Sequence, residues 1–92
     1  IDHATGRLVE GDATTQTERC LANLRHVLEA ADLTFDAVVK VNVFLTDMAD
    51  FAAMNAVYER HFRAPYPARS TIGVAALPLG ARVEIEMIAA VE

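Results

Sequence analysis

The chain has 92 residues, 53% of them apolar, and its 13 acidic and eight basic side chains give a net charge of −5. This length predicts a single domain over residues 1–92. The acidic balance disfavours a nucleic-acid partner, because phosphate binding needs clustered basic side chains. No apolar run reaches the length of about 18–20 residues that spans a bilayer, so no membrane partner is expected. The single cysteine, Cys20, excludes an internal disulfide and favours a cytoplasmic location.

The first half of the chain predicts a short extended stretch, a helix and a strand. The stretch covers residues 7–10, and Asp12 then serves as N-cap of a helix over roughly 13–31. The apolar stripe of this helix contains Cys20, Leu21, Leu24, Val27, Leu28 and Ala31.

Residues 37–46 alternate in the manner of a β-strand. One face mixes apolar and polar side chains, so we expect a partner subunit to cover part of it. The face on which all side chains are apolar carries Ala37, Val39, Val41, Val43 and Leu45, and the mixed face carries Val38, Lys40, Asn42, Phe44 and Thr46.

The second half predicts a helix, a strand, a turn and a last strand. Asp47 begins a helix over about 48–62, with an apolar stripe of Phe51, Met54, Tyr58 and Phe62. The proline-containing segment 64–67 cannot be helical and leads into a strand at about 69–76. A turn at 77–80 precedes the last strand, 82–91, which points Val83, Ile85, Met87, Ala89 and Val91 to one face and Arg82, Glu84, Glu86, Ile88 and Ala90 to the other.

This order of elements predicts an α+β domain with parallel neighbouring strands joined by right-handed crossovers. Two helices can cover only one face of the sheet. We therefore expect the other face to meet another subunit, which also adds buried apolar surface to a chain with a slim stability margin.

Arg69 is the most suggestive single residue. It stands where a rigid proline-containing segment enters a strand, so its backbone is held while its side chain reaches the end of the sheet. A guanidinium in such a place can grip a carboxylate through two parallel hydrogen bonds. The alternative is an ordinary salt bridge at the edge of the sheet.

Glu84, Glu86 and Asn55 are the other polar residues at positions suited to burial. Glu84 and Glu86 share one strand face, where either carboxylate, if desolvated, could poise a water as general base. The alternative is a solvent-facing row that Arg82 neutralises. Asn55 lies beside the apolar stripe of its helix and needs partners, either backbone groups at a seam between subunits or a ligand.

The remaining patterns indicate neither a metal site nor a cofactor. The three histidines lie far apart, with no carboxylate or cysteine at metal-ligand spacing. Cys20 lies among core-facing positions and reads as a small hydrophobe. Neither a phosphate-binding loop nor a nucleophile elbow is present.

Residues 36–48 and 51–58 resemble the RidA family, also called YjgF or endoribonuclease L-PSP. Pro67-Ala68-Arg69-Ser70-Thr71 and the segment from Leu77 to Glu86 are similar to that family's C-terminal signature, and residues 5–12 are similar to its loop before the first helix. The resemblance covers essentially the whole chain. It departs from the family at Thr71, where cysteine is frequent, and at Gly73, where glutamate is common.

The resemblance implies a chorismate-mutase-like α+β subunit with two helices packed on one face of the sheet. It implies a homotrimer with three ligand clefts between subunits, and two family strands that precede these 92 residues. It further implies hydrolysis of reactive enamines and imines, such as 2-aminoacrylate and 2-iminobutanoate, to 2-keto acids and ammonia without a cofactor. By the match, Arg69 binds the substrate carboxylate, Glu84 positions the attacking water, and Asn55 and Thr71 contact the ligand.

Two other functions remain open at this stage. One is a non-catalytic trimer that uses Arg69 to bind 2-keto acids or other small carboxylates, as a sensor or as a regulator of partner proteins. The other is endoribonuclease activity or translation inhibition, which the acidic balance disfavours because no basic groove is evident.

Overall fold

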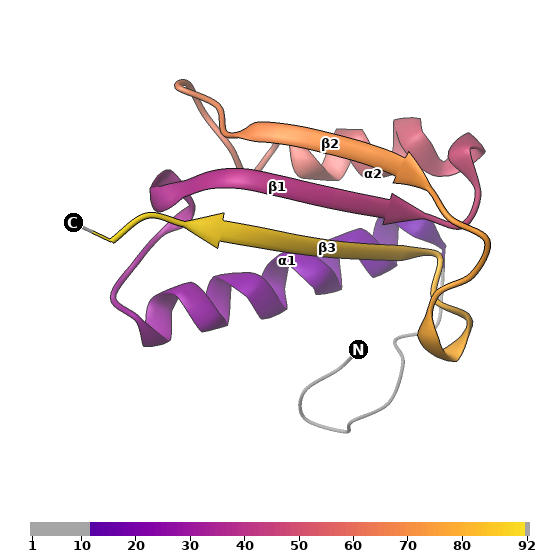
Figure 1. Ribbon diagram of the computed structural model, residues 1–92, viewed down its shortest axis with the longest axis horizontal. Helices are drawn as coiled ribbons and strands as arrows, with labels where there is room; N and C mark the ends of the chain where they lie inside the picture. Colours follow the sequence, from indigo (N-terminus) through magenta and orange to yellow (C-terminus); the bar gives the residue numbers. More distant parts are fainter. Residues whose placement is uncertain (1–11, 92) are drawn as a thin grey trace.

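A computed structural model describes residues 12–91 of the chain, and its core is a three-stranded sheet in the order β2-β1-β3. The strands are β1 (Val38–Leu45), β2 (Ala68–Gly73) and β3 (Val83–Ala89). The central strand β1 pairs with β2 in parallel and with β3 antiparallel (Figure 1). The predicted stretch 7–10 lies outside the described residues.

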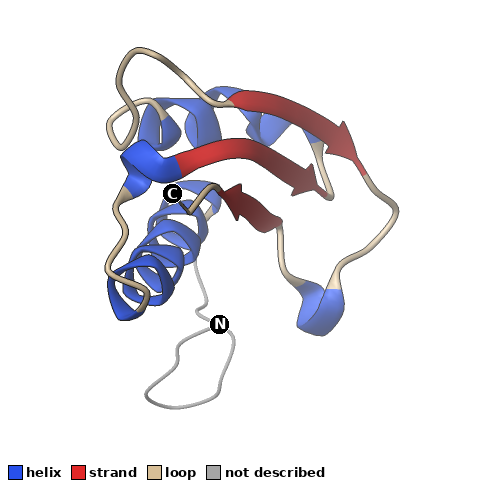
Figure 2. Cartoon of the chain, turned by 60° about the vertical axis from the view of Figure 1, so that its left-hand side comes forward, coloured by secondary structure: helices blue, strands red, loops and turns tan. Residues whose placement is uncertain are grey.

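Both helices, α1 (Ala13–Ala30) and α2 (Phe51–Tyr58), lie on one face of this sheet, as Figure 2 shows. The core between the helices and the sheet includes Leu21, Val41, Val43, Leu45 and Met54, each with no exposed side-chain surface. This arrangement confirms the predicted α+β class with two helices on one face. None of the helices in the described part of the chain is long and apolar enough to cross a membrane.

Helix α1 begins where the sequence predicts. The Asp12 carboxylate accepts a hydrogen bond from the Thr15 amide at 2.9 Å, which satisfies one of the free N–H groups of the first turn. Leu21 and Leu28 face the core, but Val27, predicted to share their stripe, is 60% exposed.

Helix α2 is shorter than predicted. The Asp47 carboxylate caps a 3₁₀ turn, Met48–Asp50, and the α-helix then ends at Tyr58. Beyond it, the Arg60 and His61 amides bond to carbonyls three residues back, so the chain tightens instead of continuing as an α-helix.

The alternation of β1 holds from Val41 onward and fails before it. A register irregularity lies between Val38 and Lys40 in the pairing with β3. As a result Val38 is buried and Val39 is 49% exposed, the reverse of the predicted faces. An extra residue in one strand of an antiparallel pair shifts the side chains on one side of it to the opposite face.

The two remaining strands are shorter than predicted at their ends, and the loop between them is tight. A 3₁₀ turn, Pro78–Gly80, stands where the sequence predicted a turn, with Leu79 and Gly80 at φ of 60° and 72°. In β3, Val83 and Ile85 are buried whereas Glu84, Glu86 and Ile88 are exposed, which confirms the predicted faces.

Candidate functional site

Arg69 lies on the helix side of β2, against one face of α2. Its Cα pairs with that of Val41, a core residue, so the two side chains share a face of the sheet. The Arg69 Nη1 donates to the Asn55 Oδ1 at 2.6 Å. The guanidinium carbon lies 4.7 Å from the ring centroid of Tyr58 and 5.5 Å from that of Phe51.

These contacts leave the Nε and Nη2 edge of the Arg69 guanidinium without a partner among residues 12–91. The Nη1 group is used on Asn55, and no carboxylate among the described residues pairs with Arg69. The predicted alternative, a salt bridge at the sheet edge, is therefore absent from residues 12–91. The Nε and Nη2 groups form the edge of a guanidinium that can donate to both oxygens of one carboxylate. Two other arginines of this chain use that edge in this way. Arg63 donates to Asp36 at 3.2 and 2.6 Å, and Arg82 donates to Asp50 at 3.1 and 3.0 Å.

Thr71 follows Arg69 on the same face of β2 and pairs with Val43. Within residues 12–91, the Thr71 Oγ1 and the Tyr58 hydroxyl are both buried without a hydrogen-bond partner. Burial raises the pKa of Tyr58. Two such unpaired groups flanking Arg69 are unusual, because most buried polar atoms in proteins have a partner.

Gly73, one of the departures from the family pattern, continues the same face of β2. A side chain there would meet Met48, because a Cβ at Gly73 would lie 3.2 Å from the Met48 Cγ. Met48 therefore fills the space that a larger residue would need.

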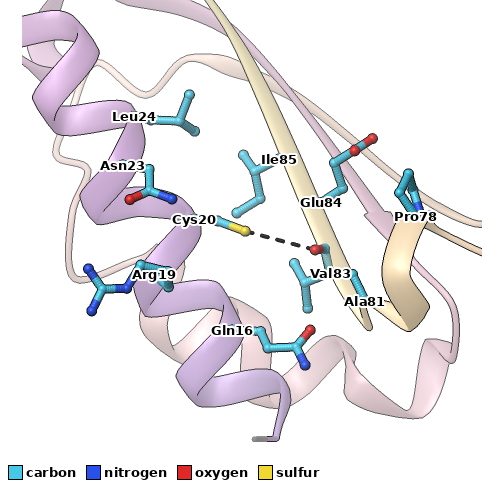
Figure 3. Close-up of a pocket in the computed structure, with 10 residues that line it drawn as sticks. All are labelled: Gln16, Arg19, Cys20, Asn23, Leu24, Pro78, Ala81, Val83, Glu84 and Ile85. Atoms are coloured by element: carbon cyan, nitrogen blue, oxygen red, sulfur yellow. Dashed lines mark hydrogen bonds between the residues drawn. The ribbon is translucent and has the colours of Figure 1, made fainter. Parts of the chain in front are cut away.

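Glu84 lies on the opposite face of the sheet from Arg69. The Cα of Phe44 pairs with Ile72 on one side and with Glu84 on the other, so these three side chains share the face that the helices leave open. Figure 3 shows the same arrangement, with Ile85 and Val83 on the α1 side of β3 and Glu84 extending from the other side. A single chain therefore does not bring Arg69 and Glu84 together.

The predicted neutral row of Glu84, Glu86 and Arg82 does not form. Arg82 turns instead to Asp50, beside α2, and Glu86 accepts a hydrogen bond from the Asn42 amide at 2.9 Å. Within residues 12–91, Glu84 has no such partner, which leaves its carboxylate available on the open face.

Arg69 lines neither of two cavities found in the described part of the chain. One, of about 240 Å³, lies between α1 and the free edge of β3, where Cys20 points at the carbonyl of Val83 at 3.8 Å (Figure 3). Burial raises the pKa of the Cys20 thiol, so it stays protonated, as expected of a small hydrophobe. No group of three metal-ligating side chains occurs in the described part of the chain.

The sequence identified Arg69 and Asn55 as candidate site residues. It did not predict that Asn55, on α2, accepts a hydrogen bond from Arg69. Phe51 and Tyr58 were assigned to the apolar stripe, yet Phe51 is 36% exposed at the point where it meets Arg69. The signal was their spacing, since Phe51, Asn55 and Tyr58 lie four and three residues apart and so fall on one face of a helix.

The Endoribonuclease L-PSP family matches residues 1–91. The chain is 46% identical over 89 residues to the goat (Capra hircus) 2-iminobutanoate/2-iminopropanoate deaminase, an alignment that covers 97% of this chain and 65% of that protein. The chain thus spans about two thirds of the length of this curated relative.

Solved structures of related proteins also match the fold of this chain. The RidA of an Antarctic Psychrobacter species superposes with a TM-score of 0.89 at 44% identity, over 96% of this chain and 71% of that one. The Escherichia coli TdcF, solved with bound serine, superposes with a TM-score of 0.88 at 38% identity, over 97% and 72%. These similarities confirm the RidA-like α+β fold expected from the sequence. The chain belongs to the Endoribonuclease L-PSP family, the RidA family that its motifs resemble.

Proposed function

We propose that this protein hydrolyses reactive enamines and imines derived from 2-amino acids to 2-keto acids and ammonia. The observation that carries this proposal is the Arg69 guanidinium, which contacts Asn55 and two aromatic rings and has no partner on its Nε and Nη2 edge among residues 12–91. That edge fits the carboxylate that every such substrate carries. The deaminase relative from goat supports the same reaction class.

The reaction needs few groups because the imine carbon is already electrophilic, more so once its nitrogen is protonated. An enamine first takes up a proton at its β-carbon and becomes the protonated imine. Water then adds to the C=N carbon and gives one proton to a base, which leaves a neutral carbinolamine. The base returns that proton to the amine nitrogen, and the hydroxyl proton leaves as the C–N bond breaks, so the products are ammonia and the 2-keto acid. Arg69 holds the carboxylate and Glu84 receives the proton of the attacking water.

A site that uses both residues must draw them from different subunits, because one chain places them on opposite faces of its sheet. The open face carries Phe44, Ile72 and Ile88, the last two 49% and 60% exposed, and this apolar surface suits burial against another copy. We therefore place the reaction in clefts between the subunits of a homotrimer, with the helices outward.

Replacement of Arg69 tests the proposal. The intact protein is given 2-iminobutanoate, made in situ by a dehydratase acting on threonine, and ammonia release is followed. Arg69→Ala should lower kcat/KM on the order of 100-fold, because the substrate carboxylate then lacks a bidentate ion pair worth about 3 kcal/mol. Arg63→Ala removes another exposed arginine, one that is paired with Asp36, and should leave the rate unchanged. Equal rates for wild type and Arg69→Ala would remove Arg69 from the mechanism.

One observation favours a second function, a non-catalytic trimer that binds small carboxylates as a sensor or regulator. The three contacts of Arg69 all come from its own chain, whereas none of the strands β1, β2 and β3 places a carboxylate on the face of the sheet that carries Arg69. The structure of TdcF with bound serine shows a relative holding a small molecule that carries a carboxylate. Calorimetry that finds 2-oxobutanoate binding at Arg69 with no acceleration of imine hydrolysis would favour this function.

A further inference from the structure

Three residues on one face of α2 surround the Arg69 guanidinium. Asn55 accepts from its Nη1 at 2.6 Å, while the rings of Tyr58 and Phe51 lie 4.7 and 5.5 Å from its central carbon. The two rings are seven residues apart, two helical turns, with Asn55 between them. One short helix thus supplies all three of these contacts.

An aromatic ring restrains an arginine differently from a carboxylate. The ring meets the guanidinium carbon, where the attraction is between the cation and the π-electrons, and the in-plane N–H donors stay free. A carboxylate partner would occupy two of those N–H donors and neutralise the positive charge of the guanidinium. The two rings therefore contact Arg69 without using its Nε and Nη2 donors, which have no partner among residues 12–91.

Tyr58 is itself held firmly. Its ring stacks on Phe62 with centroids 4.4 Å apart, and Phe62 in turn lies 5.1 Å from Phe35. Tyr58 and Phe62 are only 7% and 8% exposed. Phe51, 36% exposed, closes the other side with less support. The Tyr58 hydroxyl makes no hydrogen bond to any described residue, so the ring and not the hydroxyl accounts for the contact with Arg69.

We infer that Tyr58 and Phe51 are positioning residues that preorganise Arg69 for carboxylate binding. This inference rests on the proposed role of Arg69 and adds residues to that same site. Preorganisation lowers the entropy lost when a flexible arginine grips its ligand. Loss of a ring should therefore weaken carboxylate affinity and raise KM, with kcat retained, because the interaction with the carboxylate is common to substrate and transition state.

The test compares aromatic and aliphatic side chains at the same position in the intact protein. The probe is 2-oxobutanoate, whose dissociation constant is measured by calorimetry. Tyr58→Leu should raise that constant about fivefold and Phe51→Leu about twofold, in the order of their distances from Arg69. Tyr58→Phe keeps the ring and should bind within twofold of wild type. Phe51→Leu, at a half-open position, keeps the test valid should Tyr58→Leu fail to fold.

Val57→Ala is the matched control, because Val57 is a buried residue next to Tyr58 on α2 and is neither the hydrogen-bond partner of Arg69 nor one of its two rings. It should lower stability and leave the dissociation constant unchanged. The inference is overturned if both leucine variants bind like wild type, if Tyr58→Phe is as weak as Tyr58→Leu, or if Val57→Ala weakens binding equally. Arg69→Ala separates the two proposals, since unchanged binding in that variant would overturn the role of Arg69 itself.

Discussion

Mixing two inactive variants provides the sharpest prediction from this fold. Arg69 faces α2 and Glu84 faces the open side of the same sheet, so the proposed site takes each residue from a different subunit. Arg69→Ala and Glu84→Gln homotrimers should both be inactive. Mixed trimers should regain activity, because some clefts receive the intact Arg69 of one subunit and the intact Glu84 of its neighbour.

The expected recovery follows from counting neighbours. In a ring of subunits with cyclic symmetry, each cleft uses one particular pair of adjacent subunits. With equal amounts of the two variants, each cleft has the required pair in about one quarter of cases, so the mixture should reach about a quarter of wild-type activity. Residues acting from the same chain would give no intact cleft at any mixing ratio.

The assay is ammonia release from 2-iminobutanoate after the two variants are unfolded and refolded together. Native mass spectrometry of the refolded mixture counts the mixed trimers and so reports subunit exchange independently of activity. Wild type refolded with the Arg69→Ala/Glu84→Gln double variant should keep about a quarter of the wild-type activity if the site is composite, and about half if both residues act from the same chain. Background activity in a variant mixture that contains mixed trimers would refute the composite site.

Two further predictions concern stability. Leu45→Ala, at a fully buried position of β1, should lower the free energy of unfolding by about 3 kcal/mol in a denaturant titration. Val27→Ala, on the exposed face of α1, should change the free energy of unfolding by less than about 0.5 kcal/mol. Similar losses for both variants would contradict the described core. Burial and the nearby charges of Arg25 and Arg60 lower the pKa of His61. The stabilisation linked to neutral His61 is therefore complete above the ordinary histidine pKa of about 6.5 and lost as the pH falls through the folded-state value. Thermal unfolding at pH 7 and pH 5 should show a smaller acid-induced loss for His61→Gln than for wild type, and an equal loss would exclude His61 as its source.

The sequence by itself determined the helices, the strands and the residues that each strand presents to either face. Alternation and helical spacing are local properties, so the positions of Asp12, Arg69 and Glu84 within their elements could be read directly. Two predictions failed for different reasons. The bulge in the pairing of β1 with β3 moved Val39 outward, which is an effect of residues far apart in the sequence. The 3₁₀ bonds after Tyr58 ended α2 early, which is a local effect.

Only the tertiary structure decided how those faces combine. The faces of β2 and β3 become comparable once both strands are in register with β1, and backbone hydrogen bonds between residues far apart in sequence set that register. The register places Arg69 beneath α2 and Glu84 on the open side. The packing of α2 over β2 then brings Tyr58 and Phe51 to the guanidinium, a contact that periodicity alone assigns to the core.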